Sequence, residues 1–346
     1  MRREEDPTKL NALQWVRRAL NLPFAEILLR VSNLAKSLPR ALNRIRRSER
    51  YAAAKGKKLH LIILTDRLGD ILAAEPALAR LKQPDDYIIW LPRERFRFLL
   101  QFNQNVDEVL SVSSYTETII LRWFFPRLHW TNLQMDGALC NIFGIRVNNT
   151  VPSRINVNNY YDYGSLCDVY ALIGTGEGAQ RCPVLYPDPT FNAQAFINSI
   201  FVHGERPLFI FHPVSDEEAR SWTAEKSQVL ATWILKNTEY NILEVGLTPH
   251  LFRSDRIYPL KSEIPLSQQI KLFNHASRFL GVDSGFAHVA NAAGVHSILL
   301  IGKYRHFSSH LPWRLKAEDV VLRADGHVHE MSVERVCEAL SSEQVR

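Results

Sequence analysis

The chain has 346 residues, 46% of them hydrophobic and 23% charged, so it is long enough to form two globular domains. It has no uninterrupted apolar stretch of about 18 residues. Its first residues, MRREEDPTKL, include acidic side chains where a signal peptide has basic and then apolar ones, which predicts a cytoplasmic location. The four cysteines lack C-x-x-C spacing, so neither a disulfide framework nor a zinc knuckle is indicated.

The formal net charge of +6 is unevenly distributed along the chain. Residues 1–58 contain 15 Lys and Arg against 5 Asp and Glu, a net charge of +10, whereas the remainder carries −4. The body of the protein lacks the basic, aromatic-interleaved surface that nucleic-acid binding requires. We therefore expect no nucleic-acid partner.

Residues 1–56 contain no strand pattern and are predicted to form a basic helical extension. Apolar residues recur at i, i+3, i+4 and i+7 between Pro23 and Pro39, as in an amphipathic helix with a proline at either end. One interpretation is a helix that holds residues 1–58 on an anionic membrane, which would make the protein peripheral on the inner face of the cytoplasmic membrane. The alternative is a helix packed on the body with a solvated charged face.

Strands and helices alternate from residue 59, which predicts a parallel, doubly wound α/β sheet. Strands are predicted at 59–65, 87–91 and 106–112, with helices at 71–82 and 93–102. Pro76 lies inside the first of these helices and predicts a late start or a kink there. The aromatic- and Asn-rich segment 113–165 gives no clear pattern, and a helix is predicted at 165–173.

A second alternating set follows a proline-punctuated segment that has the composition of an interdomain linker. The predicted strands are 208–212, 240–245, 277–282, 297–301 and 319–323, and the helices are 224–236, 266–274 and 332–340. The expected organisation is an extension (1–56), an N-terminal Rossmann-like acceptor domain (57–182), a linker (183–206), a C-terminal Rossmann-like donor domain (207–330), and a closing helix and tail (331–346).

The loop after the first predicted strand reads Thr65-Asp66-Arg67-Leu68-Gly69-Asp70. A carboxylate at the carboxyl end of a parallel strand faces the mouth of the sheet, where a general base is useful. Asp70 is the candidate base, and Gly69 beside it would permit close approach of a substrate. We assign Arg67 and Gly69 to the acceptor side. The alternative for Asp70 is an ordinary helix N-cap.

The loop after strand 208–212 contains Ser215 and Arg220. A guanidinium remains charged and binds oxyanions in a forked geometry, so Arg220 suits a diphosphate and could stabilise it as a leaving group. Ser215 is assigned to the donor side. The alternative is a surface arginine paired with Glu217 or Glu218.

The sequence Asp283-Ser284-Gly285-Phe286-Ala287-His288 follows a short apolar strand and opens a helix. At such a turn, unpaired backbone N–H groups and the helix dipole face a bound anion. His288 could bind a ligand there, or it could serve as a capping or packing residue.

No metal site or cofactor is predicted from the sequence. His306 and His310 are four residues apart, and His327 and His329 are separated by one residue, but no carboxylate or cysteine pattern completes either pair.

Three stretches, in this order, resemble the heptosyltransferases of glycosyltransferase family 9: LIILTDRLGDILAAEPALARLK (61–82), FHPVSDEEARSWTAEK (211–226) and FLGVDSGFAHVANAAGVHSILLIG (279–302). The resemblance covers roughly residues 57–340. It implies a GT-B fold, in which two Rossmann-like domains face a cleft. It also implies an inverting, metal-independent transfer of a heptose or related sugar from a nucleotide-diphosphate donor to a glycan or lipid-linked acceptor, in lipopolysaccharide or surface-polysaccharide synthesis.

The resemblance also implies roles for individual residues. The acidic residue of the L-G-D motif, the family's proposed base, corresponds to Asp70. The basic residue before the tryptophan of the second motif contacts donor phosphate and corresponds to Arg220. The D-S-G-x-x-H turn holds the donor, and its positions correspond to Asp283, Ser284, Gly285 and His288.

The chain departs from the family pattern in its second motif, where Val214 and Thr223 replace the usual glycine and proline. A Cβ at position 214 would enter an expected tight loop. This departure leaves open an alternative from another class, a non-catalytic nucleotide-sugar-binding protein of the same fold. A nicotinamide-dependent oxidoreductase is disfavoured, because no G-x-G-x-x-G motif follows a first strand.

Overall fold

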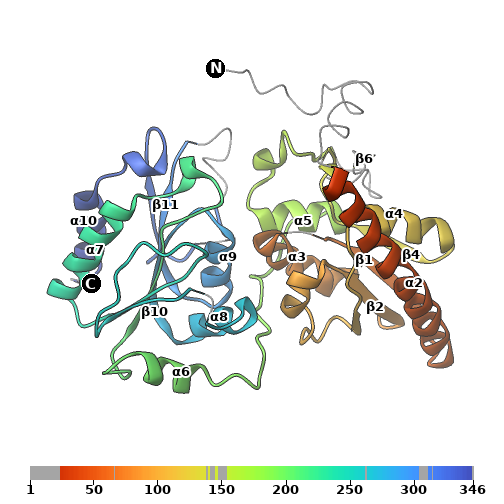
Figure 1. The fold of residues 1–346 in the computed structure, drawn as a ribbon. Coiled ribbons are helices and arrows are strands. Elements are labelled where there is room, and N and C mark those ends of the chain that lie inside the picture. Colours follow the sequence, from red (N-terminus) through yellow and green to blue (C-terminus); the bar gives the residue numbers. More distant parts are fainter. Residues whose placement is uncertain are drawn as a thin grey trace. The chain divides into compact units, whose positions relative to one another are not determined.

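The computed structural model describes residues 24–65, 67–137, 139–140, 145–146, 154–261, 263–303, 311–313 and 315–344. The chain divides into two compact α/β units (Figure 1). The first comprises residues up to 67, 77–163 and 168–179, and the second comprises 68–76, 164–167 and 180–346. Within the described ranges, no helix has the length and apolar character needed to cross a membrane.

The first unit is built on a four-stranded, all-parallel sheet in the order β3-β2-β1-β4. The strands are β1 (Lys58–Ile63), β2 (Asp86–Leu91), β3 (Glu108–Val109) and β4 (His129–Asn132). The other elements here are the helices α4 (Tyr115–Phe124) and α5 (Leu166–Thr175), the 3-10 helices η2 (Glu94–Leu99) and η3 (Tyr160–Tyr163), and the short antiparallel pair β5 (Leu139–Cys140) and β6 (Ile145–Arg146). The continuous apolar run of β1 is buried after its first residue, as a central strand of a parallel sheet requires.

Several local expectations for this unit need correction. The helix predicted at 71–82 is α3 (Leu68–Leu81), which begins earlier and runs through Pro76. The helix predicted at 93–102 is the 3-10 helix η2, and the third strand is only two residues long. Segment 113–165, which has no clear sequence pattern, supplies both α4 and β4.

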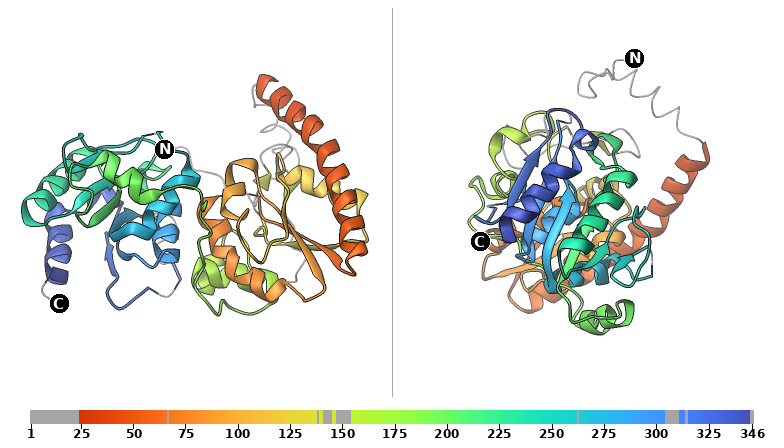
Figure 2. Two further views of the ribbon diagram at one scale, coloured as in Figure 1. Left: turned by 90° about the horizontal axis from the view of Figure 1, so that it is seen from below. Right: turned by 90° about the vertical axis from the view of Figure 1, so that its left-hand side faces the viewer.

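The described part of the N-terminal extension forms the helix α2 (Phe24–Ala54), which continues through Pro39 instead of ending there. Its C-terminal half buries Ala41, Ile45, Ser48 and Ala52, a helical spacing that places one face against the protein. That face packs with β1 and β2 in one apolar core, and both figures show α2 lying along the sheet (Figures 1 and 2). This burial outweighs the hydrogen bond lost at the proline.

The second unit contains a six-stranded, all-parallel sheet in the order β12-β11-β10-β7-β8-β9. The strands are β7 (Leu208–His212), β8 (Asn241–Glu244), β9 (Ile257–Pro259), β10 (Ala276–Val282), β11 (His296–Ile301) and β12 (Val320–Arg323). The helices are α6 (Ala193–Ile200), α7 (Ala224–Asn237), α8 (Leu266–Leu272), α9 (Gly285–Ala292) and α10 (Val333–Gln344), with short 3-10 helices η4 (Glu218–Arg220), η5 (Phe273–His275) and η7 (Val328–Glu330). The five predicted strands are confirmed, whereas β9 and α6 have no counterpart among the predicted elements.

The strand order of the second unit has the doubly wound pattern 3-2-1-4-5-6, counted from β7 as the first strand. The order reverses between β7 and β10, and ligands in such sheets bind outside the carboxyl ends of the strands at this point. The topology therefore predicts a ligand site at the loops after β7 and β10.

Candidate active site

The donor-side residues predicted from the sequence lie in the loops after β7 and β10 and in the first turn of α9. Ser215 and Arg220 follow β7, and the turn that begins at Asp283 follows β10. The two strands are adjacent and parallel, so both loops leave the same edge of the sheet.

Arg220 connects the two loops. Its Nη1 lies 3.4 Å from both a carboxylate oxygen and the main-chain oxygen of Asp283, and its Nη2 lies 2.5 Å from a carboxylate oxygen of Asp216. Its carboxylate partners are thus Asp283 and Asp216, not the Glu217 or Glu218 of the alternative interpretation. Burial raises the pKa of the Asp283 carboxyl, and the adjacent guanidinium opposes this rise.

The loop after β7 has a defined shape. Trp222 is 1% exposed, and its Nε1 donates to the main-chain oxygen of Met331. The main-chain N–H of Ser215 donates to Oγ of Ser221, and Oγ of Ser215 donates to Asp216. This bonding holds the loop that contains Arg220.

Neither departure from the family motif distorts this loop. Val214 has no positive φ, so its backbone adopts a conformation that tolerates a Cβ. Thr223 is the N-cap of α7 and accepts a hydrogen bond from the main-chain N–H of Lys226. The concern that Val214 disrupts the loop is therefore not supported by the backbone.

The turn after β10 leads into α9, with Ser284 at the N-cap position. The Ser284 side chain makes no capping hydrogen bond, and its buried Oγ has no hydrogen-bond partner among the described residues. A buried hydroxyl without a partner is costly unless a ligand or water satisfies it. The helix start thus offers backbone N–H groups and one unpaired hydroxyl to an anion.

The start of α3 lies against the start of α9 within the second unit. A Cβ added to Gly69 would lie 2.9 Å from Cδ2 of His288, and one added to Gly285 would lie 2.9 Å from the Leu68 side chain. Both glycines are needed for this approach, because real Cβ atoms do not come so close. The L-G-D and D-S-G-x-x-H motifs therefore meet at these two helix starts.

Asp70 lies in the first turn of α3 and is half-buried. The N-cap position of this helix is occupied by Arg67, so Asp70 is not the N-cap that the alternative interpretation required. Arg67 is exposed and has φ of +67°, the single positive φ among the described non-glycine residues. Such a backbone conformation is strained for an arginine and is typical of functional turns.

Two further buried side chains at this edge of the second sheet, His212 and Glu244, were not identified as site residues from the sequence. His212 ends β7, is buried, and donates from Nδ1 to the main-chain oxygen of Val245 at 2.8 Å. Burial lowers the pKa of His212 to about 4, so the ring is neutral at pH 7. Its ring packs edge-on against Phe286 of α9, with 4.7 Å between centroids.

Glu244 ends β8 and is 1% exposed. Its carboxylate accepts main-chain hydrogen bonds from His250 and Leu251 at 2.6 and 2.7 Å, which fixes the loop after β8. Burial is the main cause of a raised pKa at Glu244. No sequence pattern distinguishes this glutamate from a surface one, because its role depends on a loop that returns to it.

Residues 187–340 match the model of glycosyltransferase family 9 (heptosyltransferase). No curated protein sequence is similar enough to be matched. Among solved structures, a family 9 glycosyl transferase from Veillonella parvula is 15% identical, with a TM-score of 0.63 over 83% of this chain and 97% of its own. The ADP-heptose LPS heptosyltransferase II of E. coli is 16% identical, with a TM-score of 0.63 over 83% and 98%. The E. coli heptosyltransferase WaaC with ADP is 15% identical, with a TM-score of 0.54 over 82% and 99%.

These matches confirm the resemblance predicted from the three motifs, and the likeness to solved structures extends beyond the residues matched by the family model. The two parallel-sheet units and the added helix α2 agree with a GT-B-like heptosyltransferase fold that carries an N-terminal helical extension. The likeness to glycosyltransferase family 9 therefore lies in residues 187–340, and the likeness to solved structures shows the fold.

Proposed function

We propose that this protein is an inverting, metal-independent glycosyltransferase that moves a heptose or related sugar from a nucleotide-diphosphate donor to a glycan or lipid-linked acceptor. The reaction would belong to the synthesis of lipopolysaccharide or another surface polysaccharide. The observation that carries the proposal is the convergence of Arg220, the start of α9 and the start of α3. Solved relatives are described as ADP-heptose enzymes, which makes ADP-heptose the first donor to test.

On the donor side, the backbone N–H groups at the start of α9 and the Oγ of Ser284 would bind the diphosphate. Arg220 would balance the charge that develops on the leaving group, a contribution that often dominates such reactions. Asp283 would hold the guanidinium in place through the contacts that it already makes. Ser215, in the loop after β7, and His288, in α9, would complete the donor site.

On the acceptor side, the Asp70 carboxylate would accept the proton of an acceptor hydroxyl as its oxygen attacks the anomeric carbon. The bond from that carbon to the diphosphate breaks as the new bond forms on the opposite face, and the electron pair leaves with the diphosphate. One displacement of this kind inverts the anomeric configuration. Arg67 and Gly69 would contact the acceptor.

The test is release of nucleoside diphosphate with ADP-heptose and an acceptor present. Asp70→Asn should lower kcat by about 10² to 10⁴, the range for loss of a general base. Glu225→Gln is a matched control, because Glu225 is an exposed acid in the first turn of α7. Unchanged turnover in Asp70→Asn would remove Asp70 as the base. A product with the same anomeric configuration as the donor, measured by NMR, would exclude an inverting reaction.

We also propose that the first half of α2 associates with an anionic membrane surface on the cytoplasmic side. Leu28 and Leu29 are 52% and 60% exposed, and they lie in the segment that carries the excess of basic residues. Trp123, 75% exposed, is on α4, which packs beside α2. Exposed apolar side chains on a basic amphipathic helix are the features with which such helices enter a membrane interface.

A further inference from the structure

Three side chains without a proposed catalytic role lie close together in the first unit, near the beginnings of three adjacent strands. They are His60 on β1, Asp86 on β2 and His129 on β4. His60 is the direct register partner of His129, and Asp86 is the partner of Lys58, two residues before His60. Because side chains alternate along a strand, all three project from the same face of the sheet.

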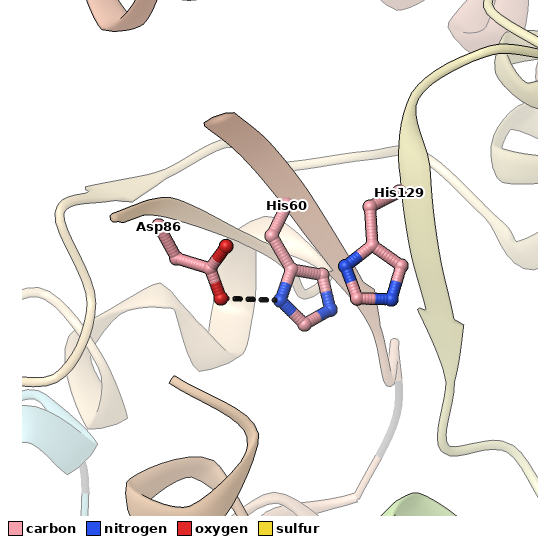
Figure 3. A group of neighbouring side chains, drawn as sticks. All are labelled: His60, Asp86 and His129. Carbon is pink, nitrogen blue, oxygen red and sulfur yellow. Dashed lines mark hydrogen bonds and ion pairs between the residues drawn. The ribbon is translucent and has the colours of Figure 1, made fainter. Parts of the chain in front are cut away.

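Figure 3 shows the two imidazole rings face to face, with the carboxylate of Asp86 beside His60. The ring centroids are 3.8 Å apart with 18° between the planes. One ligand atom from each residue can be chosen so that all three lie within 4.8 Å of one another. Two imidazoles and a carboxylate form a ligand set that divalent first-row metals accept.

The separation between His60 and Asp86 already suits a shared ion. Nδ1 of His60 lies 3.3 Å from a carboxylate oxygen of Asp86, which is long for a hydrogen bond from a ring nitrogen. Two ligands of a tetrahedral Zn²⁺ with bonds of about 2.0–2.1 Å are separated by about 3.3–3.4 Å. A ring nitrogen of His129 lies within 4.8 Å of both other ligand atoms, and its exposed ring would have to rotate to bring that nitrogen to the same separation.

The hydrogen bonds around the cluster favour the ligand-competent forms. Nε2 of His60 lies 2.9 Å from Oγ1 of Thr131, which can accept its proton and leave Nδ1 as the ligand nitrogen. The main-chain N–H of Gln83 donates to the same carboxylate oxygen of Asp86 at 3.0 Å and fixes its orientation. Partners of this kind orient metal ligands in known sites.

His60 and Asp86 are buried, whereas His129 is exposed and leaves a route from solvent. Among the described residues, the His129 ring has no hydrogen-bond partner. The hydrogen bonds that satisfy His60 therefore do not explain why a second imidazole is stacked on it.

We propose that His60, Asp86 and His129 form a structural site for one divalent first-row metal ion, with Zn²⁺ as the best-suited probe, and that water completes its coordination. The ion would connect β1, β2 and β4 at the edge where these strands begin. Asp70 lies in α3, which follows the other end of β1, so the site is separate from the reaction proposed above and does not depend on it.

A second group in the described part of the chain, His327, His329 and Glu330, has similar spacing but a different explanation. His327 and Glu330 form a reciprocal capping box at the start of η7, and the group is largely exposed. Its side chains are thus already engaged in a local turn. This group supplies the control for the experiment.

The experiment is a titration of untagged, full-length protein with Zn²⁺ in competition with a chromophoric chelator. His129→Ala is the main variant, because an exposed side chain can be removed without loss of the fold. We expect the wild type and His329→Ala to bind one Zn²⁺ ion with equal affinity, and His129→Ala to bind it about 100-fold more weakly. Equal affinity in the wild type and His129→Ala overturns the proposal.

Two further measurements test the geometry. Co²⁺ substitution should give the intense visible absorption of a tetrahedral site in the wild type and not in His129→Ala. Thr131→Val, which removes only the second hydrogen bond of His60, should weaken binding by about tenfold. A Co²⁺ spectrum that is the same with and without His129 would place the ion elsewhere and contradict the assignment.

Discussion

Arg220 and Asp283 form an ion pair that joins the loop after β7 to the end of β10, with Nη1 3.4 Å from a carboxylate oxygen. Each side chain is about one-fifth exposed, so the pair is shielded from water but accessible to a ligand. The pair fixes a guanidinium at the point where the strand order of the second sheet reverses.

The first prediction concerns this guanidinium. Arg220→Met should lower kcat for nucleoside diphosphate release by about 10² to 10³, because an oxyanion-stabilising donor is lost. Arg220→Lys should recover part of the rate, since it retains the charge without the forked geometry. Steady-state kinetics with ADP-heptose measure both. If Arg220→Met changes KM alone, Arg220 contributes to binding and not to departure of the leaving group.

A second prediction concerns the close approach of α3 to α9. Gly69→Ala should destabilise the protein by about 1–3 kcal/mol, because the new Cβ would lie 2.9 Å from the His288 ring. His288→Ala removes that ring, so the double variant should recover most of the loss. Urea unfolding of the four proteins in this cycle measures the coupling. Additive effects would mean that the two helix starts are not in contact in solution.

The third prediction is a pH dependence of stability caused by His212. Its pKa is lowered from 6.5 to about 4 in the folded protein, so the unfolded chain binds the extra proton first as the pH falls. Stability should therefore decrease on acidification between these values, by about 2 kcal/mol from pH 7 to pH 5. Urea unfolding at the two pH values, compared with His212→Gln, isolates this contribution. An equal decrease in the variant would assign the effect to other groups.

A fourth prediction concerns the segment after residue 180. Nη1 and Nη2 of Arg181 donate to the buried carboxylate of Glu75, at 2.8 and 2.6 Å, and the main-chain N–H of Val184 donates to it as well. Arg181→Met should cost about 2 kcal/mol, less than a fully buried pair because Arg181 is about one-third exposed. Adding Glu75→Gln should recover part of the loss, because the buried charge is then removed. Thermal unfolding of the single and double variants measures these changes in stability. A double variant that is no more stable than Arg181→Met would contradict this account.

The fifth prediction concerns the membrane surface. Replacing both Leu28 and Leu29 by Ser should weaken binding to vesicles that contain phosphatidylglycerol by about tenfold or more. Binding of the wild type should also weaken as salt is raised, because basic residues contribute. Leu247→Ser is the control, since Leu247 is fully exposed in the second unit. Unchanged vesicle binding in the double variant would exclude α2 as the membrane contact.

The elements that the sequence predicts well are those whose own residues determine their structure. β7 is buried along its whole length, and β10 and β11 end in the buried apolar runs 279–282 and 298–301. The turn after β10 carries its own glycine and helix start. The pairing of Arg220 with Asp283 could not be predicted, because it depends on β7 and β10 being neighbours although they are 63 residues apart in sequence at this contact.

The elements that the sequence does not reveal depend on tertiary partners. β4 has the polar sequence HWTN, yet Thr131 and Asn132 are buried, and Asn132 donates to the hydroxyl of Tyr115 in α4. Buried polar residues of this kind resemble a loop until their partners are known. The same applies to His60 and His129, which are 69 residues apart and meet only because β1 pairs with β4.

The course of α2 through Pro39 has a practical consequence for anyone who shortens this chain. A protein that begins at residue 57 would lack Ala41 and Ile45, and Leu59, Leu61 and Ile89 of the sheet would lose their cover. Such a truncation would test the folding of the first unit and not its attachment to a membrane. Variants that leave residues 41–54 intact are therefore the ones that can separate attachment from folding.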